Sequence, residues 1–558
     1  MTKPKKKKSQ GLDLWIEFLA PEKNFFVVSF IYACGISLLS LAIPISVQAL
    51  VNTVTFAVLM QPLLVVTFLL LILLIFSGFL NGLQDYAVEY FQRHFYARSS
   101  LEMSQRLLNS RASSLKGFYR GDLVNRYFDI MSVQKKGAKL MVGGFSLILQ
   151  TMVGMLLLAF YHPYFLAFDL ILVFLIFLVW ALFGKKALDS AIVESKAKYK
   201  VASWLEQLAS ENKFFKNATR KKAAKAYTNS LVDNYLEKRA FHFRYLFRQI
   251  IFLLGIYAFL SALILGLGGF LVMEGQLTLG QLVAAEIVVA VILSGFAKSG
   301  DYLESMYDLH ASLDKIADFT ILEEEDLSGT VSFDIGNGDL SFDQVSIDVN
   351  NYSYTFHADF KGGAAYLINE DFDATQRVFL ELSHGDLHPQ RGKIYLGATD
   401  CQEINPCTLR EHLYIVDEPT ILEGSILQNI IWGLENVSDA DVNEVLDLVG
   451  LSHYIETLPE GKNTQIWPGT SLLFWGESIR MEMARALLKK PTWVIISSLF
   501  LQLPRETQNH LLNVFKKRGI GVIVFSTGYG ETPKGFDAEF SFQRAEKKLS
   551  VGNQKEEM

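Results

Sequence analysis

The sequence predicts a membrane protein in two parts, a bundle of six transmembrane helices followed by an α/β domain. Half of its 558 residues are hydrophobic and its mean hydropathy is +0.24, which is high for a soluble protein of this length. The apolar residues dominate the first 300 positions. From about residue 331 onward, short strand-like and helix-like segments alternate instead.

Three long runs that are almost free of ionisable side chains predict the six helices. A helix needs about 20 apolar residues to cross a bilayer, so each run can hold two spans and a turn. Counting Asp, Glu, Lys, Arg and His, the runs are residues 24–84, with none; residues 141–184, with His162 and Asp169; and residues 249–297, with Glu274 and Glu286. We therefore expect a transmembrane domain over residues 24–318, with two long loops at about 85–140 and 185–248.

The distribution of Lys and Arg predicts the orientation. The turns expected inside the three runs contain neither residue, whereas both long loops and the tail at residues 1–23, with its "TKPKKKK", are rich in them. By the positive-inside rule these segments face the cytosol. We expect a multi-pass protein of the inner (plasma) membrane, in contact with the lipid bilayer and with no nucleic acid, whose N- and C-termini are both cytosolic.

The sequence becomes more polar after the last apolar run. Residues 319–335 form an acidic, polar linker, residues 336–546 an α/β domain and residues 547–558 a polar tail. Continuous apolar segments such as "TWVIIS" and "GVIVFS" are typical of buried parallel strands. They alternate with helix-like segments such as "SIRMEMARALLKK", so we expect a largely parallel sheet covered by helices.

Several strings, in the right order, resemble ABC exporter half-transporters. "GDLVNRYFDI" resembles the first coupling region, "GQLTLGQLVA" the turn into the sixth helix, and "MARALLKKP" the helix after the signature. "EGSILQNIIWG" and "LPEGKNTQI" resemble the stretches before the signature, and "HPYFLAFDL" is similar to type I secretion (RTX-type) exporters. The resemblance covers nearly the whole chain. It implies a type-1 exporter transmembrane domain, a P-loop-NTPase-like ABC nucleotide-binding domain, and function as a dimer.

The stretch at the family's phosphate loop lacks the residues that bind a nucleotide. That loop has the pattern G-x-x-x-x-G-K-[ST], whose backbone N–H groups and Lys cradle the phosphates. Here Asn369 and Ala374 stand at the glycines, Thr375 at the lysine and Gln376 at the magnesium-binding hydroxyl, with Glu370, Asp371, Phe372 and Asp373 between them. Two like charges 4 Å apart repel by about 4 kcal/mol at an effective dielectric constant of 20, so we expect this loop to disfavour ATP.

The other nucleotide motifs also depart from the family pattern. The Walker B Asp and Glu are replaced by Ser497 and Ser498, the Q-loop Gln by Asp417 or Glu418, the signature by Leu473, Phe474, Trp475, Gly476 and Glu477, and the switch His by Gly528. Phosphoryl transfer depends on positioning and electrostatics. We therefore expect a pseudo-ATPase with no catalytic residues, no cofactor, and weak or absent binding of ATP and Mg²⁺. A misaligned site elsewhere in the domain is the alternative.

Three functional hypotheses follow. The first is a structural or regulatory half of an export complex, as a homodimer or as a heterodimer with another ABC half-transporter, with a periplasmic adaptor as a candidate further partner. The second is a non-transporting membrane scaffold or sensor that recruits a partner. The third is an active ATP-driven exporter with divergent motifs. The sequence names no substrate.

Polar residues inside the predicted spans are further candidates. Asp169 and Glu286 lie within two turns of an extracytoplasmic end, where they could form a transport site or line a wet vestibule. His384 and His388 have no Cys or carboxylate cluster to complete a ligand set, so we expect no metal site.

Overall fold

The computed structural model describes residues 16, 18–56, 60–115, 120–370, 373–469, 472–526 and 534–546. The chain forms two compact units, Met1–Glu324 and Glu325–Met558. The division falls inside the linker expected at residues 319–335, and the part from Glu325 onward belongs to the C-terminal unit. The lysine-rich stretch of the N-terminal tail and residues 547–558 lie outside the described residues.

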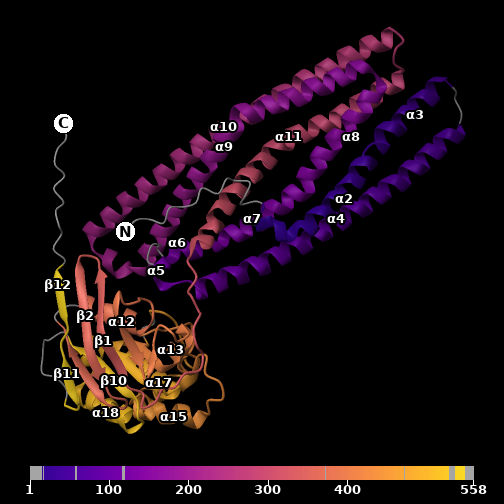
Figure 1. Cartoon of the computed structure of the whole chain (residues 1–558). Helices are drawn as coiled ribbons and strands as arrows, with labels where there is room; N and C mark the ends of the chain where they lie inside the picture. The colour runs from indigo at the N-terminus through magenta and orange to yellow at the C-terminus, as the bar shows by residue number, and fades with distance from the viewer. Residues whose placement is uncertain are drawn as a thin grey trace, which may run out of the picture. The chain divides into compact units, whose positions relative to one another are not determined.

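The N-terminal unit is a bundle of long helices (Figure 1). Its elements are η1 (Ala20–Glu22), α2 (Lys23–Leu39), α3 (Ala42–Phe56), α4 (Met60–Leu108), α5 (Ala112–Leu115), α6 (Arg120–Asn125), α7 (Tyr127–Lys139), the π-helical turn η2 (Leu140–Gly144), α8 (Phe145–Tyr161), α9 (Pro163–Ser210), η3 (Asn212–Lys216), α10 (Ala218–Met273), α11 (Leu279–Ile316) and η4 (Ala317–Ile321). Three hairpins are present, α2–α3 with α4, α8 with α9, and α10 with α11. The connections of the second and third hairpins, at residue 162 and residues 274–278, lie inside the second and third apolar runs, as expected; residues 57–59, between α3 and α4, lie outside the described residues.

Five helical stretches of the described residues are long and apolar enough to cross a membrane. They are Ala20–Thr55, Met60–Leu108, Leu123–Tyr161, Pro163–Ser210 and Ala218–Met273. The apolar part of α11, Leu279–Ile292, is shorter, because charged residues occur along α11 from Lys298 onward. The six predicted spans thus correspond to five long apolar stretches and one shorter one.

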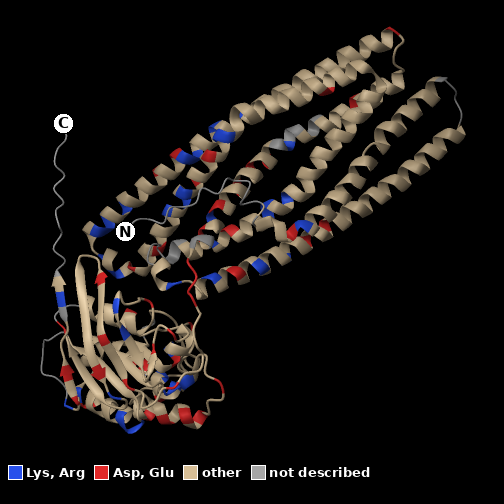
Figure 2. Ribbon diagram, viewed as in Figure 1, with Lys and Arg blue, Asp and Glu red and all other residues tan. Residues whose placement is uncertain are grey.

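The longest helices extend well beyond a bilayer. Helices α4, α9 and α10 have 49, 48 and 56 residues, which at 1.5 Å per residue is roughly 70–85 Å, against about 30 Å for a hydrocarbon core. Figure 2 shows Lys, Arg, Asp and Glu gathered over one half of this bundle, while the other half is almost free of charge. The two long loops expected from the sequence are mostly these polar helix ends.

A buried ion pair fixes the start of the chain to α4. The Glu22 side chain is fully buried, and its carboxylate accepts hydrogen bonds from Arg98 Nε (2.8 Å) and from His94 Nδ1 (3.0 Å). Arg98 also donates from Nη2 to the Phe18 carbonyl at 3.0 Å. Residues 18–23, which the sequence assigns to a basic tail, are therefore packed against the bundle.

A second buried cluster joins three polar helix ends. Asp129 of α7 accepts hydrogen bonds from Tyr199 of α9 (2.7 Å) and Ser312 of α11 (3.1 Å). The Lys315 ammonium lies over the Tyr199 ring and donates to the Ser195 carbonyl at 3.1 Å. Burial lowers the pKa of Lys315 to about 7, although the Asp129 carboxylate favours its charged form. Burial likewise raises the pKa of Asp129.

Replacing Glu22 by Ala is expected to destabilise the N-terminal unit by about 3–5 kcal/mol, because it leaves Arg98 without its buried counter-charge. The measurement is thermal unfolding of the purified full chain. Glu102→Ala, which removes only the exposed partner of Arg98, is the matched control, with an expected loss of at most about 1 kcal/mol. Equal effects of the two substitutions would contradict this account.

The buried Lys315 also predicts how stability changes with pH. Between pH 7 and its ordinary pKa of 10.5, the unfolded chain binds a proton at this residue that the folded chain does not. The free energy of unfolding therefore rises with pH over this interval. The midpoint of thermal unfolding is expected to increase from pH 7 to pH 9, and this slope should shrink in Lys315→Met. An unchanged slope in that variant would refute the assignment.

The C-terminal unit is an α/β domain with two larger sheets (Figure 1). The antiparallel sheet has the order β12-β2-β1-β4-β5, the sheet β11-β3-β10-β9-β6 is parallel, and β7 pairs with β8. The strands are β1 (Leu340–Val349), β2 (Tyr352–Phe360), β3 (Ala365–Asn369), β4 (Arg391–Leu396), β5 (Thr399–Asp400), β6 (Leu413–Val416), β7 (Gly424–Ser425), β8 (Gln465–Ile466), β9 (Trp493–Ile496), β10 (Gly521–Ser526), β11 (Ala538–Phe540) and β12 (Gln543–Glu546).

Helices complete the core of this domain. They are α12 (Asp373–Ser383), α13 (Pro406–His412), α14 (Ile426–Ile431), α15 (Asp439–Leu448), α16 (Ser452–Glu456), η5 (Gly461–Asn463), α17 (Trp475–Lys489), η6 (Ser498–Gln502) and α18 (Arg505–Lys517). Every residue of β9 and β10 is buried. This confirms the interpretation of their continuous apolar sequences as central parallel strands.

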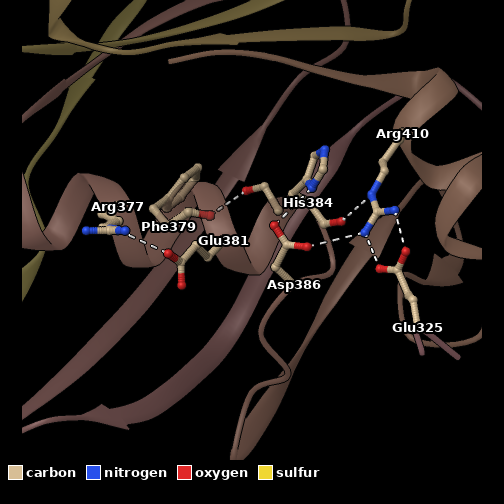
Figure 3. A network of polar contacts seen from close by, with 8 residues as sticks. Glu325, Arg377, Phe379, Glu381, His384, Asp386 and Arg410 are labelled. Carbon is tan, nitrogen blue, oxygen red and sulfur yellow. Dashed lines mark hydrogen bonds and ion pairs between the residues drawn. The ribbon is translucent and has the colours of Figure 1, made fainter. Parts of the chain in front are cut away.

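Arg410 ties the acidic linker to this domain. Its guanidinium donates to the Glu325 carboxylate, to Asp386 Oδ1 (3.3 Å) and to the His384 carbonyl (3.1 Å) (Figure 3). The His384 ring in turn contacts the Asp386 carboxylate at 3.1 Å. His384 is therefore part of an ion-pair network that holds the linker in place.

Candidate nucleotide site

The candidate site lies at the carboxyl ends of four parallel strands. Strands β3, β10, β9 and β6 run in parallel register and end at Asn369, Ser526, Ile496 and Val416. Ligands of open α/β sheets bind beyond this edge. Segments that are far apart in the sequence therefore meet where the family would bind ATP.

Hydrogen bonds within the chain join the loops at this edge. Ser497 donates its backbone N–H to the Val416 carbonyl and its hydroxyl to the Asp417 carbonyl, both at 2.8 Å. Gln376 Oε1 accepts the backbone N–H of Ser498 at 3.2 Å. The structure therefore brings together the residues at the Q-loop, Walker B and magnesium positions. Their polar groups bond to one another.

Thr375, which stands at the position of the phosphate-binding lysine, points into the protein. Its side chain is 1% exposed, and within the described part of the chain its Oγ1 has no hydrogen-bond partner. It lies in the first turn of α12, after the exposed Ala374. A threonine in this place has no positive charge, and its side chain is too short to extend to a phosphate as a lysine would. Asp371 and Phe372 lie outside the described residues.

The start of the loop is braced by the C-terminal segment. The buried Glu370 carboxylate accepts the backbone N–H of Phe542 at 2.8 Å, and Asn369 Nδ2 donates to Glu539 at 2.9 Å. The Phe542 ring stacks on Phe379 of α12, with ring centroids 5.8 Å apart. Glu370 thus serves as an internal hydrogen-bond acceptor in the place where a nucleotide loop presents N–H donors.

Two tyrosines of β2 are covered by other parts of the domain. Strand β12 pairs with β2, and the Arg544 guanidinium lies 3.9 Å from the centre of the Tyr352 ring. Tyr354 is 3% exposed. The sequence gives no sign of the contact between Arg544 and Tyr352, because only the alternation of polar and apolar residues in "FSFQRAE" indicates a strand there.

The electrostatic environment is unfavourable for a polyphosphate. Desolvation raises the pKa of Asp417, and the neighbouring Glu418 carboxylate raises it further, against the opposing effect of Arg377. Arg377 is mostly exposed and pairs with Glu381 at 3.1 Å (Figure 3). The charges at this edge are therefore mainly negative.

The signature position presents aromatic side chains. Helix α17 begins at Trp475 with Phe474 as its N-cap, and these side chains are 45% and 69% exposed. Gly476 has open space around it, and Glu477 Oε2 is buried with no partner among the described residues. Small residues would leave the helix N-terminus open to a phosphate, whereas Phe474 and Trp475 place bulk there. Gly528, at the switch position, is outside the described residues.

The two intramembrane carboxylates are placed as expected near helix starts. Asp169 is buried on α9, and within the described chain neither of its carboxylate oxygens has a partner. Glu286 on α11 is half-buried, and its Oε2 has none either. Residues flanking both of them, such as Phe168 and Ala285, belong to one hydrophobic cluster. Both roles proposed for these carboxylates, part of a transport site or the lining of a wet vestibule, stay predictions.

Among the described residues, no group of three or more His, Cys, Asp or Glu side chains is arranged to hold a metal ion.

Comparison with known proteins identifies the architecture. Residues 26–295 match the ABC transporter transmembrane region. A protein of Rickettsia felis described as an export ATP-binding/permease protein is 25% identical over 485 residues, 81% of this chain and 79% of its own length. The structure of a bacterial Atm1-family ABC exporter with ATP bound has a TM-score of 0.75 at 16% identity and 91% coverage of each chain.

The chain is similar to ABC half-transporters in its transmembrane region and in its fold.

The chain also resembles a β-(1→2)glucan export ATP-binding/permease protein, NdvA of Agrobacterium vitis, with 25% identity over 262 residues, 45% of this chain and 44% of that protein. The expected fold, a helical transmembrane domain followed by an ABC-type α/β domain, is confirmed by these matches and by the two units of the structure. The similarity to type I secretion exporters stays a prediction.

Thr375 gives a stability test of the altered loop. Thr375→Val keeps the shape and removes a buried hydroxyl without a partner, so the free energy of unfolding is expected to stay equal or rise by about 1 kcal/mol. Thr375→Lys places an ammonium in the same buried position and is expected to destabilise the domain by more than about 2 kcal/mol. The measurement is thermal unfolding of the full chain. A stabilising Thr375→Lys would show that the lysine position opens to solvent.

Proposed function

We propose that this chain is a structural or regulatory half of an export complex and that its ABC domain does not hydrolyse ATP. The observation that carries the proposal is the set of hydrogen bonds that the loops at the carboxyl edge of the parallel sheet form with one another. Thr375 stands buried in place of the lysine, and Ser497 and Ser498 stand in place of the Walker B carboxylates. Neither ATP nor Mg²⁺ is expected as a cofactor.

The dimeric architecture implied by the family strengthens the argument. In that arrangement each ATP lies between the phosphate loop of one chain and the signature of the other. A homodimer of this chain would pair an altered loop with the exposed Phe474 and Trp475 at both sites. In a heterodimer with an intact half-transporter, one ATP site would contain this chain's altered phosphate loop. The other site would contain its altered signature. We propose that the complex lies in the inner membrane with both termini in the cytosol.

One observation favours the second candidate function, a membrane scaffold or sensor. Phe474 and Trp475 expose aromatic surface at adjacent positions, and exposed aromatic side chains are typical of protein–protein interfaces. On this proposal the signature helix would contact a partner protein where an active domain contacts ATP.

The test is ATP hydrolysis by the purified full chain in lipid nanodiscs. The wild type is expected to show no turnover above the buffer rate. The variant Ala374→Gly/Thr375→Lys is expected to stay inactive, because Ser497 and Ser498 cannot hold Mg²⁺ or act on the attacking water. Partial activity is expected at most when Ser497→Asp and Ser498→Glu are added.

Two outcomes would overturn the proposal. The first is wild-type turnover that is lost in Thr375→Ala, which would establish the active-exporter alternative. The second is full activity from the loop substitutions alone, which would show that the Walker B positions matter little. Lys517→Gln, on the exposed C-terminal turn of α18, serves as the control for non-specific effects.

A further inference from the structure

The N-terminal unit contains a large cavity that the nucleotide site does not involve. Its volume is about 1270 Å³, larger than the roughly 300–1,000 Å³ of ordinary small-molecule pockets. Three segments far apart in the sequence form its walls: the start of the chain around α2, the middle of α9, and the last turns of α11. All of them belong to the same unit.

The walls are mainly apolar. Phe26 and Val27 of α2 line the cavity on one side, and Trp180 and Leu188 of α9 on another. The Trp180 side chain is 58% exposed. Its indole lies over Gly184, where an added Cβ would come within 3.1 Å of the ring. The glycine thus makes room for an aromatic side chain in the wall of the cavity.

The two lysines of the cavity both lie at the ends of apolar runs, where the helices are expected to leave the bilayer. Lys23 directly precedes the uncharged run 24–84, and Lys185 directly follows the apolar run 141–184. Both residues line the cavity, and both therefore mark the point where an apolar helix leaves the bilayer. Lipid head groups, and interfacial tryptophans such as Trp180, lie at this level.

The charge of the cavity has one sign. Its lining contains Lys23, Lys185 and His310 but no Asp or Glu. Neither lysine forms an ion pair with a residue that the structure describes. Burial lowers the pKa of His310, against the opposing effects of Asp314 and Asp189, so the two lysines supply the positive charge. An apolar cavity with two ammonium groups at head-group level fits a molecule with acyl chains and an anionic head.

We propose that this cavity binds an anionic phospholipid of the surrounding bilayer. The acyl chains lie against Phe26, Val27 and Trp180, and the phosphate lies between Lys23 and Lys185. The cytoplasmic leaflet supplies such lipids, and by the positive-inside rule the two lysines face that leaflet. The buried Glu22–Arg98 pair holds the wall that carries Lys23 in position. The site does not depend on whether the ABC domain hydrolyses ATP.

The experiment is quenching of tryptophan fluorescence by lipids brominated on their acyl chains, with the full chain purified in an uncharged detergent. The Trp180 signal is the difference between the wild type and Trp180→Phe. Brominated phosphatidylglycerol is expected to quench it saturably, with half-saturation at a concentration at least fivefold lower than for brominated phosphatidylcholine carrying the same chains. In Lys23→Gln/Lys185→Gln this preference is expected to disappear.

A matched control separates the site from general charge effects. Lys186→Gln removes a neighbouring exposed lysine that does not line the cavity and is expected to keep the full preference. Ala181→Phe adds bulk at an exposed lining position and is expected to lower the maximum quenching. Equal quenching by the two lipids in the wild type would overturn the proposal. So would a preference that survives in the double variant, or no quenching of Trp180 by either lipid, which is the result expected if a second copy of the chain fills the cavity.

Discussion

The hydrogen bonds at the carboxyl edge of the parallel sheet are the constraint on which the account of this chain depends. Backbone N–H and C=O groups in the loops after β6 and β9 need hydrogen-bond partners once the strands end. Here the Ser497 hydroxyl donates to the Asp417 carbonyl. Glu370 does the same for the C-terminal segment through Phe542. Because these bonds form within the chain, they satisfy polar groups at this edge without any ligand.

The elements of the fold were largely predictable because their periodicities are strong. The uncharged runs fixed the hairpins, and continuous apolar segments identified β9 and β10 as central strands. Parallel topology then placed Asn369, Val416 and Ile496 at one edge, so the convergence of the altered motifs followed from their order along the chain. The sequence predicted less well where tertiary contacts override a local pattern. Glu22 lies in a stretch that resembles a solvated tail, yet Arg98, 76 residues further on, buries it.

The contacts that fill the candidate site could not be predicted in the same way. Arg544 covers Tyr352 only because β12 pairs with β2 in one register, and a register across nearly 200 residues leaves no signal in a single sequence. The inward direction of Thr375 depends on the rotation of α12 about its axis. The cavity beside Lys23 and Lys185 likewise appears only when α2, α9 and α11 are packed together.

We propose that the chain's own groups occupy the carboxyl edge of the sheet, so that this edge does not bind nucleotide. Equilibrium titration of the full chain with Mg-ATP, followed by calorimetry, tests it most directly. We expect no saturable binding up to about 1 mM, which corresponds to a binding free energy weaker than about −4.1 kcal/mol. Saturable binding at micromolar concentrations, abolished by substitution of Thr375 or Ser497, would contradict it.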